Sequence, residues 1–287
     1  MLFSFSIGVR PTGVRQTSLR ILGSVILTAG AALAQNAQDI VQKSVERDWT
    51  DYSSRKDYTY QERLEIREYG SDGNLNKKRS ETNEVLVLEG RPYDRLVARD
   101  GRPLNEKDAR KEQEKLDRES EKRRSESPAE RAKIEKDRAA QRKFIREVPQ
   151  AFQFRLDGVD KISGQPVWVI DATPKPGFKP VESQAKLFAK VHAKVWIDQA
   201  TYHWVKVDAQ ALDTLSFGLG LLRVAPGGTL HFEQTRVNDE IWLPSLTQVR
   251  ADARLALLKK LRAEIDFTYH DYKKFQTDSR LIVNPAE

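Results

Sequence analysis

The chain has 287 residues, of which 39% are hydrophobic and 32% charged, and its formal net charge is +7. This length suits one large domain or two ordinary ones, with enough apolar material for a sizeable core. The absence of cysteine excludes disulfides, thiolate metal sites and a cysteine nucleophile.

The first 34 residues have the features of a secretory signal peptide. Arg15 and Arg20 precede an apolar run, Ile21–Leu33, and small residues end that run at Ala34. The run is shorter than the roughly 20 apolar residues that span a bilayer. We therefore predict that Met1–Ala34 is removed, which leaves a periplasmic or secreted protein that is not transmembrane. An uncleaved N-terminal anchor is the alternative.

The basic charge gives little support to a nucleic-acid partner. Three of the seven surplus charges are Arg10, Arg15 and Arg20 of the leader, so the mature chain retains +4. The remaining basic clusters, Arg123-Arg124 and Lys259-Lys260, lie among acidic residues or at a hairpin turn, where lysines commonly protect a sheet. We predict no nucleic-acid binding.

The mature chain is expected to begin with one helix and three strands. Apolar residues at helical spacing predict an amphipathic helix over Gln38–Thr50 that packs on a sheet. Alternating side chains then predict strands over residues 58–66, 75–89 and 93–99, separated by turns that contain glycine. The apolar stripe of the helix consists of Ala37, Ile40, Val41, Val45 and Trp49.

Roughly two thirds of the residues in Glu106–Glu147 are charged, with both signs interleaved, as is typical of solvent-exposed helices. Ser127-Pro128 has the features of a helix start, so we predict two helices here. The chain is thus expected to form a single domain over residues 35–287, with a helical insertion at about residues 105–148. The insertion is either a lid or partner-binding arm, or simply a solvated connection.

The second half of the chain predicts a long antiparallel meander. Strands are expected over 152–156 and 167–170, and a hairpin follows in which Val191, Ala193, Val195 and Ile197 share one face with Val205, Val207 and Ala209. Further strands are expected over 229–237, 240–243, 247–257 and 261–269. About ten strands make a sheet large enough to curl. We therefore predict an α+β, mainly β fold, in which a strongly curved antiparallel sheet forms an incomplete barrel.

No motif indicates catalysis. His192, His203, His231 and His270 have no partner at metal-ligand spacing and are expected on the solvated face, so neither a metal site nor a cofactor is predicted. Nucleophile elbows, phosphate-binding loops and dinucleotide fingerprints are absent from the sequence. A non-enzymatic protein is therefore the favoured interpretation.

A curved sheet covered by helices either fills its concave side with side chains or leaves a ligand cavity. The most apolar stretch, Leu215–Leu222, contains two glycines that permit close approach of another group or a bend. The five tryptophans are candidates for a cavity wall or for plain core packing. The candidate cavity residues are Phe217, Leu219, Leu221, Ile265, Phe267 and Trp168.

Three segments in the middle of the chain have a distinctive pattern: Gly158-Val159, Ile162-Ser163-Gly164-Gln165-Pro166-Val167-Trp168-Val169-Ile170 and Val195-Trp196-Ile197-Asp198. In these segments, and in an organisation that covers most of Gln35–Tyr272, the chain resembles the LolA/LolB-like outer-membrane lipoprotein carrier superfamily. The resemblance implies a half-barrel with a helical lid that shelters acyl chains of lipids or lipoproteins, and some members instead sense envelope stress. It supplies no individual ligand residue, and Glu106–Glu147 departs from the family pattern.

The leading hypothesis is thus a periplasmic carrier for lipid or lipoprotein acyl chains. The alternative is an envelope regulatory or interaction module whose charged helices, Glu106–Glu147, recognise an envelope protein. The sequence identifies neither the ligand nor the oligomeric state.

Overall fold

A computed structural model describes residues 36–52, 54–70, 72–217, 222–255 and 259–275. The predicted signal peptide, residues 1–34, lies outside the described residues, as do Leu219 and Leu221. Among the helices that the structure describes, none is long and apolar enough to cross a membrane.

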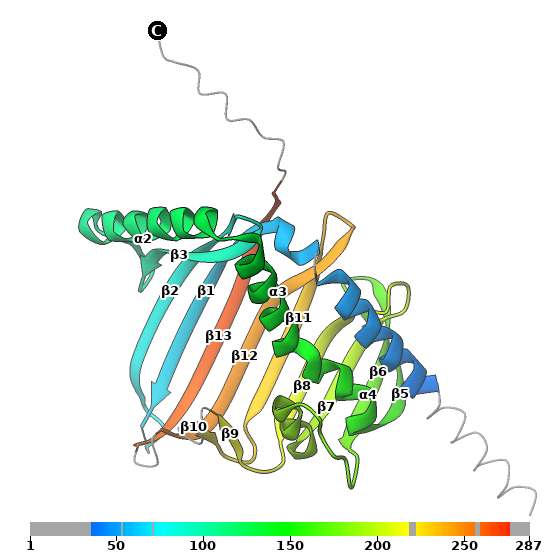
Figure 1. The fold of residues 1–287 in the computed structure, drawn as a ribbon. Helices are drawn as coiled ribbons and strands as arrows, with labels where there is room; N and C mark the ends of the chain where they lie inside the picture. Colours follow the sequence, from blue (N-terminus) through cyan, green and yellow to red (C-terminus); the bar gives the residue numbers. More distant parts are fainter. Residues whose placement is uncertain (1–35, 53, 71, 218–221, 256–258, 276–287) are drawn as a thin grey trace, which may run out of the picture.

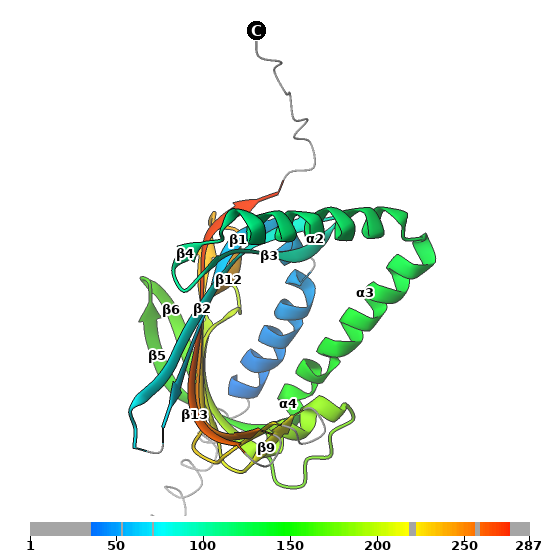
Figure 2. The ribbon, with the colours of Figure 1, turned by 90° about the vertical axis from the view of Figure 1, so that its left-hand side faces the viewer.

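The strands form a single 13-stranded antiparallel sheet with the order β4-β3-β2-β1-β13-β12-β11-β8-β7-β6-β5, while β10 also pairs with β12, and β9 pairs with β10. Figure 2 shows that the sheet is strongly curved. It does not close, because β4 and β5 are its two edges. The predicted fold class, an incomplete barrel, is confirmed. The strands are β1 (Tyr58–Tyr69), β2 (Leu75–Leu88), β3 (Arg91–Arg99), β4 (Arg102–Pro103), β5 (Phe152–Ile162), β6 (Gln165–Pro174), β7 (Val191–Asp198), β8 (Trp204–Ala211), β9 (Leu215–Phe217), β10 (Leu222–Val224), β11 (Thr229–Val237), β12 (Ile241–Leu255) and β13 (Lys259–Lys274).

Pairing between β1 and β13 joins the first meander to the last one. Residues that are some 200 positions apart lie opposite one another, for example Ile66 and Ile265. The strands before and after the helical insertion therefore belong to one sheet. The segments 240–243 and 247–257, which we expected as separate strands, are one strand, β12, with a register shift beside Pro244.

The helices lie on one side of the sheet (Figures 1 and 2). The N-terminal helix, residues 36–51, crosses β5–β8, and the two helices of the insertion meet at an angle, the first along one end of the sheet and the second returning toward the opposite end (Figure 2). The insertion splits where the sequence predicts, because Ser127 and Glu130 form a capping box with Pro128 in the first turn. The other helical segments are η1 (Ser54–Asp57), α2 (Glu106–Ser125), α3 (Pro128–Arg142), η2 (Lys143–Glu147), α4 (Val148–Ala151) and η3 (Ser183–Lys190).

Tight turns set the register of the hairpins. Asp100 and Gly101 both have positive φ, 51° and 76°, and Ser163 and Gly164 have 50° and 81°. Two consecutive residues with positive φ make the turn that matches the right-handed twist of paired strands. These turns fix which side chains of the flanking strands share a face.

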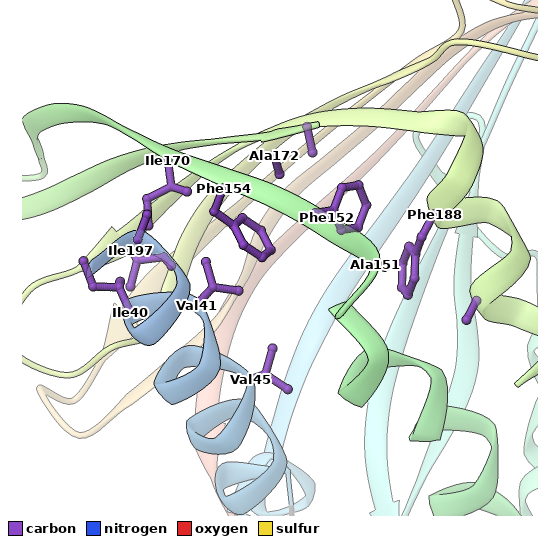
Figure 3. Packing of buried hydrophobic residues seen from close by; sticks show 13 residues of the cluster. Ile40, Val41, Val45, Ala151, Phe152, Phe154, Ile170, Ala172, Phe188 and Ile197 are labelled. Carbon is purple, nitrogen blue, oxygen red and sulfur yellow. The ribbon is translucent and has the colours of Figure 1, made fainter. Parts of the chain in front are cut away.

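The main core lies between the N-terminal helix and strands β5–β7 (Figure 3). Ile40 and Val41 of the helix approach Ile170 and Ile197, which are 0% and 1% exposed. The predicted stripe of the helix is confirmed at Ala37, Ile40, Val41 and Val45, all buried. Phe144, Ile145 and Val148, which follow the charged helices, pack against the same core and attach the insertion to the sheet.

The opposite, convex face carries alternating charges. Asp171 lies opposite Lys194, and Lys194 lies opposite Asp208 on the next strand. Opposite charges on adjacent strands stabilise a pairing, and their side chains occupy the face away from the helices. Along this part of β6, β7 and β8 the period-two alternation thus separates an apolar concave face from a charged convex one.

Candidate functional site

A cavity of about 530 Å³ lies on the concave face, between the sheet and the helical segments. Its wall on the sheet side comes from strands β5 to β12, and its other wall comes from the N-terminal helix, α4 and η3. None of the described residues that line it is charged. The lining residues are Val41, Ser44, Val45, Val148, Phe152, Phe154, Ala172, Leu187, Phe188, Val191, Ala193, Val195, Ile197, Trp204, Val207, Ala209, Gln210, Ala211, Leu215, Val224, Gly228, Thr229, Leu230, Val249 and Ala251.

Small side chains at one level of the sheet explain why this space is not filled. Ala172, Ala193 and Ala209 are consecutive cross-strand partners on β6, β7 and β8, and Leu230 and Val249 continue the row. Cross-strand partners point to the same face, so three adjacent strands present only methyl groups there. The row forms a shallow floor where larger residues would have made solid core.

Aromatic and aliphatic side chains form the rim of this floor. The rings of Phe152 and Phe188 lie 5.5 Å apart, so β5 and η3 meet at one end of the cavity. In Figure 3 Val41 and Val45 project from the N-terminal helix on the side of Phe154 and Phe152. The helix therefore covers the cavity as well as the adjacent core.

The prediction that two rows of the hairpin share one face is only partly confirmed. Val191, Ala193, Val195 and Ile197 all line the cavity, as alternation predicts. Val205 does not, because a β-bulge pairs Trp196 with Lys206 but Ile197 with Trp204. The extra residue turns Val205 toward Val167 and Trp242, and it brings Trp204 into the cavity wall instead.

Three of the six predicted cavity residues, Ile265, Phe267 and Trp168, have side chains that the structure describes. Ile265 and Phe267 lie on the concave face of β13, where Ile265 is the cross-strand partner of the lining residue Val249, but neither is among the described residues that line the cavity. Trp168 also lies outside the lining and packs against Tyr202, with ring centroids 5.2 Å apart. These three residues extend the apolar face beyond the cavity.

The glycine-containing stretch contributes strands at the cavity edge. Leu215 of β9 lines the cavity, and Phe217 ends the same strand as the partner of Leu222. The side chain of Phe217 is outside the described part of the chain, as are Leu219 and Leu221. The alanine row and the bulge at Val205 were missed from the sequence. Each of these alanines stands in an alternating strand pattern in the sequence. Their small size leaves space for a cavity only because β6, β7 and β8 become neighbours and bring the three alanines side by side.

A buried ionic cluster attaches α3 to the N-terminal helix at the upper end of the cavity region. Asp48, whose side chain is 3% exposed, lies 2.5 Å from Nη2 of Arg142 and 2.8 Å from Nη2 of Arg55. Lys56 pairs with Glu135 of α3. No residue of α3 itself is buried, so these ion pairs, together with the apolar residues that follow α3, determine its position.

The expectation that every histidine lies on the solvated face is wrong for His203. Its side chain is 3% exposed, and Nε2 lies 2.6 Å from Oδ2 of Asp51 on the N-terminal helix. Burial lowers the pKa of His203, while Asp51 opposes that shift. Within the described residues, no group of three or more His, Cys, Asp or Glu side chains is placed to hold a metal ion.

One acidic side chain on the concave face, Glu62, has a raised pKa. Burial raises the pKa of Glu62, although a hydrogen bond with Asn83 opposes the shift. Glu62 lies opposite Tyr269 in the β1–β13 pairing, and Tyr60 packs within 5.0 Å of Tyr272. These groups form a separate aromatic cluster and do not line the cavity.

Comparison with known proteins finds similarity in solved structures alone. No protein-family model matches the sequence, and no curated protein matches it. The chain is similar to a DUF1329 family protein from Desulfovibrio piger, with 12% identity, a TM-score of 0.32, and coverage of 84% of this chain and 93% of the other.

Two further solved structures are also similar to this chain. A putative outer membrane lipoprotein-sorting protein domain from Vibrio parahaemolyticus is 11% identical, with a TM-score of 0.30 and coverage of 84% and 95%. The LolA superfamily protein NE2245 from Nitrosomonas europaea is 12% identical, with a TM-score of 0.29 and coverage of 84% and 93%.

Proposed function

We propose that this protein is a periplasmic carrier or chaperone that shelters the acyl chains of lipids or lipoproteins, without catalysing a reaction. The observation that carries the proposal is the cavity of about 530 Å³ whose described lining contains no charged residue. Pockets for small ligands typically have about 300–1,000 Å³, so the size suits one or more acyl segments.

The energetics favour a flexible apolar ligand. Each methylene group that leaves water contributes about 0.8 kcal/mol, so an acyl chain gains affinity along its whole length without polar contacts. The alanine floor at Ala172, Ala193 and Ala209 supplies a smooth apolar surface for it. Nothing in this mode of binding requires the paired acids or nucleophiles of a catalytic site.

The proposal includes the location and organisation of the mature chain. Export through the predicted signal peptide, Met1–Ala34, would place a soluble carrier between membranes that contain its lipid cargo. Residues 35–287 would act as one domain, in which the helical insertion at about residues 105–148 covers the concave face. The sequence of the N-terminus of the exported protein tests the cleavage after Ala34.

The test is lipid uptake by the purified mature protein, measured by native mass spectrometry and by displacement of a fluorescent fatty acid. We expect Ala193→Phe to weaken binding at least tenfold, because the ring occupies the floor of the cavity. The matched control is Val159→Phe on β5, where the native side chain is 70% exposed and the ring stays in solvent. Equal uptake by both variants, or no uptake by the native protein, would contradict the proposal.

The second candidate is an interaction module that binds an envelope protein. It is favoured by α2, which projects beyond the sheet (Figure 2) and carries exposed charges such as Arg118 and Lys122, 69% and 73% exposed. Arg118→Glu/Lys122→Glu should abolish crosslinking to such a partner and leave lipid uptake unchanged. An unchanged crosslinking pattern would argue against this candidate.

A further inference from the structure

A second pocket, of about 470 Å³, adjoins the apolar cavity. The two spaces share Leu187 of η3 and Leu215 of β9 in their linings. Beyond these two leucines the character of the wall changes, because every other described lining residue is polar or charged. These residues are Ser183, Gln184, Lys186, Lys190, Thr214 and Ser216.

The two lysines differ in how much of their hydrogen-bonding capacity is used. Nζ of Lys190 donates to the backbone oxygen of Thr214 at 2.9 Å and lies 2.9 Å from the carboxylate of Asp213. An ammonium group has three donors, so one remains. Lys186 is exposed and makes no hydrogen bond or ion pair with any residue that the structure describes. The pocket therefore presents cationic donors without a complete set of acceptors.

The surroundings of the pocket are also basic. The segment from Pro174 to Lys190 contains four lysines and a single acid, Glu182. On the other side, Arg223 of β10 is the cross-strand partner of the lining residue Ser216. Asp213 is the acid that pairs with a pocket lysine, and that lysine holds the pKa of Asp213 below its usual range.

We propose that the ligand of this protein is an anionic amphiphile, with its acyl chain in the apolar cavity and its phosphate or carboxylate group on Lys186 and Lys190. This inference rests on the proposed carrier function and specifies the class of cargo. Charge-assisted hydrogen bonds to an anion are stronger than neutral ones, and the leucine pair places them where the apolar wall ends. Because both lysines reach solvent, the headgroup stays hydrated on one side while the chain is buried.

The experiment compares two amphiphiles that have the same myristoyl chain, one with a phosphoglycerol headgroup and one with uncharged glycerol, and adds inorganic phosphate as a third probe. The native mature protein should bind the anionic amphiphile about tenfold more tightly, which corresponds to about 1.4 kcal/mol. Lys186→Gln/Lys190→Gln should remove this preference and leave affinity for the neutral amphiphile unchanged. Asp213→Asn should strengthen anionic binding, because it frees Lys190.

The matched control is Lys161→Gln/Lys273→Gln, which also removes two exposed lysines. Lys161 lies beside the turn between β5 and β6, whereas the loop to η3 follows the other end of β6. This control should keep the preference. Equal affinity of the native protein for the two amphiphiles would overturn the inference and leave the carrier function intact, whereas failure of both to bind would overturn the carrier function as well. Binding of inorganic phosphate as tight as that of the anionic amphiphile would show a site for free anions and also overturn it.

Discussion

Two parts of the concave face differ both in how they are covered and in the residues that they carry. On β6 and β7, beneath the N-terminal helix, Ile170 and Ile197 are almost fully buried. On β1 and β13, Ile66 and Ile265 occupy the same face and remain half-buried. We call β5–β8 the covered half and β1, β2 and β13 the outer half. Hydrogen bonding is continuous across both, but the N-terminal helix covers only the first, and in the second β2 places Arg79 and Glu81 on the same face as Ile66 and Leu64.

The cavity lies where these halves meet. Its floor begins under the N-terminal helix at Ala172 and Ala193 and ends at Val249, whose next partner is Ile265 of the outer half. A ligand bound in the cavity would bury part of the apolar surface that the outer half exposes. The difference between the halves thus explains why an apolar space remains accessible in a stable fold.

The largest expected effect tests the difference in burial directly. Ile170→Ala should lower the free energy of unfolding by about 3 kcal/mol, because it opens a cavity in packed core. Ile265→Ala, in the outer half, should cost about 1 kcal/mol, because its side chain is only partly buried. Urea unfolding measures both. Equal costs would show that the outer half is as well packed as the covered half.

The next effect concerns the ion pairs that attach α3 to the covered half. Asp48→Asn leaves Arg55 and Arg142 without their shared carboxylate, and both arginines are mostly buried. We expect a loss of about 2 kcal/mol, less than for a fully buried pair because each arginine retains some contact with water. Hydrogen exchange in α3 should become faster. Asp137→Asn, an exposed acid on the same helix, is the control and should change neither quantity.

The attachment of α2 to the outer half should be weaker. Nη1 of Arg123 donates to the backbone oxygens of Leu88 and Arg91 at 3.1 and 3.0 Å, and its side chain is 9% exposed. Arg123→Ala should cost about 1.5 kcal/mol, since it leaves strand-end carbonyls without this donor. Arg118→Ala, on the exposed face of α2, should cost almost nothing. If Arg123→Ala destabilised the protein more than Asp48→Asn, the order of the two attachments would be reversed.

The smallest effect is a dependence of the free energy of unfolding on pH, which comes from His203 in the covered half. Burial lowers the pKa of His203 below its ordinary 6.5, so the unfolded chain binds a proton before the folded one does as the pH falls. The contribution of neutral His203 to the free energy of unfolding is therefore fully present above pH 6.5. It declines below that pH toward the folded-state pKa of His203, by at most about 1.4 kcal/mol per pH unit. Urea titrations from pH 7.5 to 5 should show this decline. It should disappear in His203→Gln and persist in the variant of the exposed His270, His270→Gln.

Local patterns in the sequence identified most elements of the fold. The apolar stripe of the N-terminal helix, the helix start at Ser127-Pro128 and the alternation of Val191 to Ile197 each depend on neighbours within a few residues, and the structure has each of them. The bulge that displaces Val205 was not predicted, because a single extra residue reverses the two faces without changing composition. Trp204, which alternation with Val205 puts on the other face, lines the cavity for this reason.

The sequence by itself thus determined that the chain forms a large two-faced antiparallel sheet with an amphipathic helix and two charged helices, because periods of 2 and 3.6 residues are local properties. The tertiary structure decided that β1 pairs with β13, that the apolar face is concave, and that Ala172, Ala193 and Ala209 lie side by side. Those outcomes depend on contacts between residues far apart in the chain. A period-two pattern defines two faces of a strand but specifies neither the neighbouring strand nor the helix that covers it.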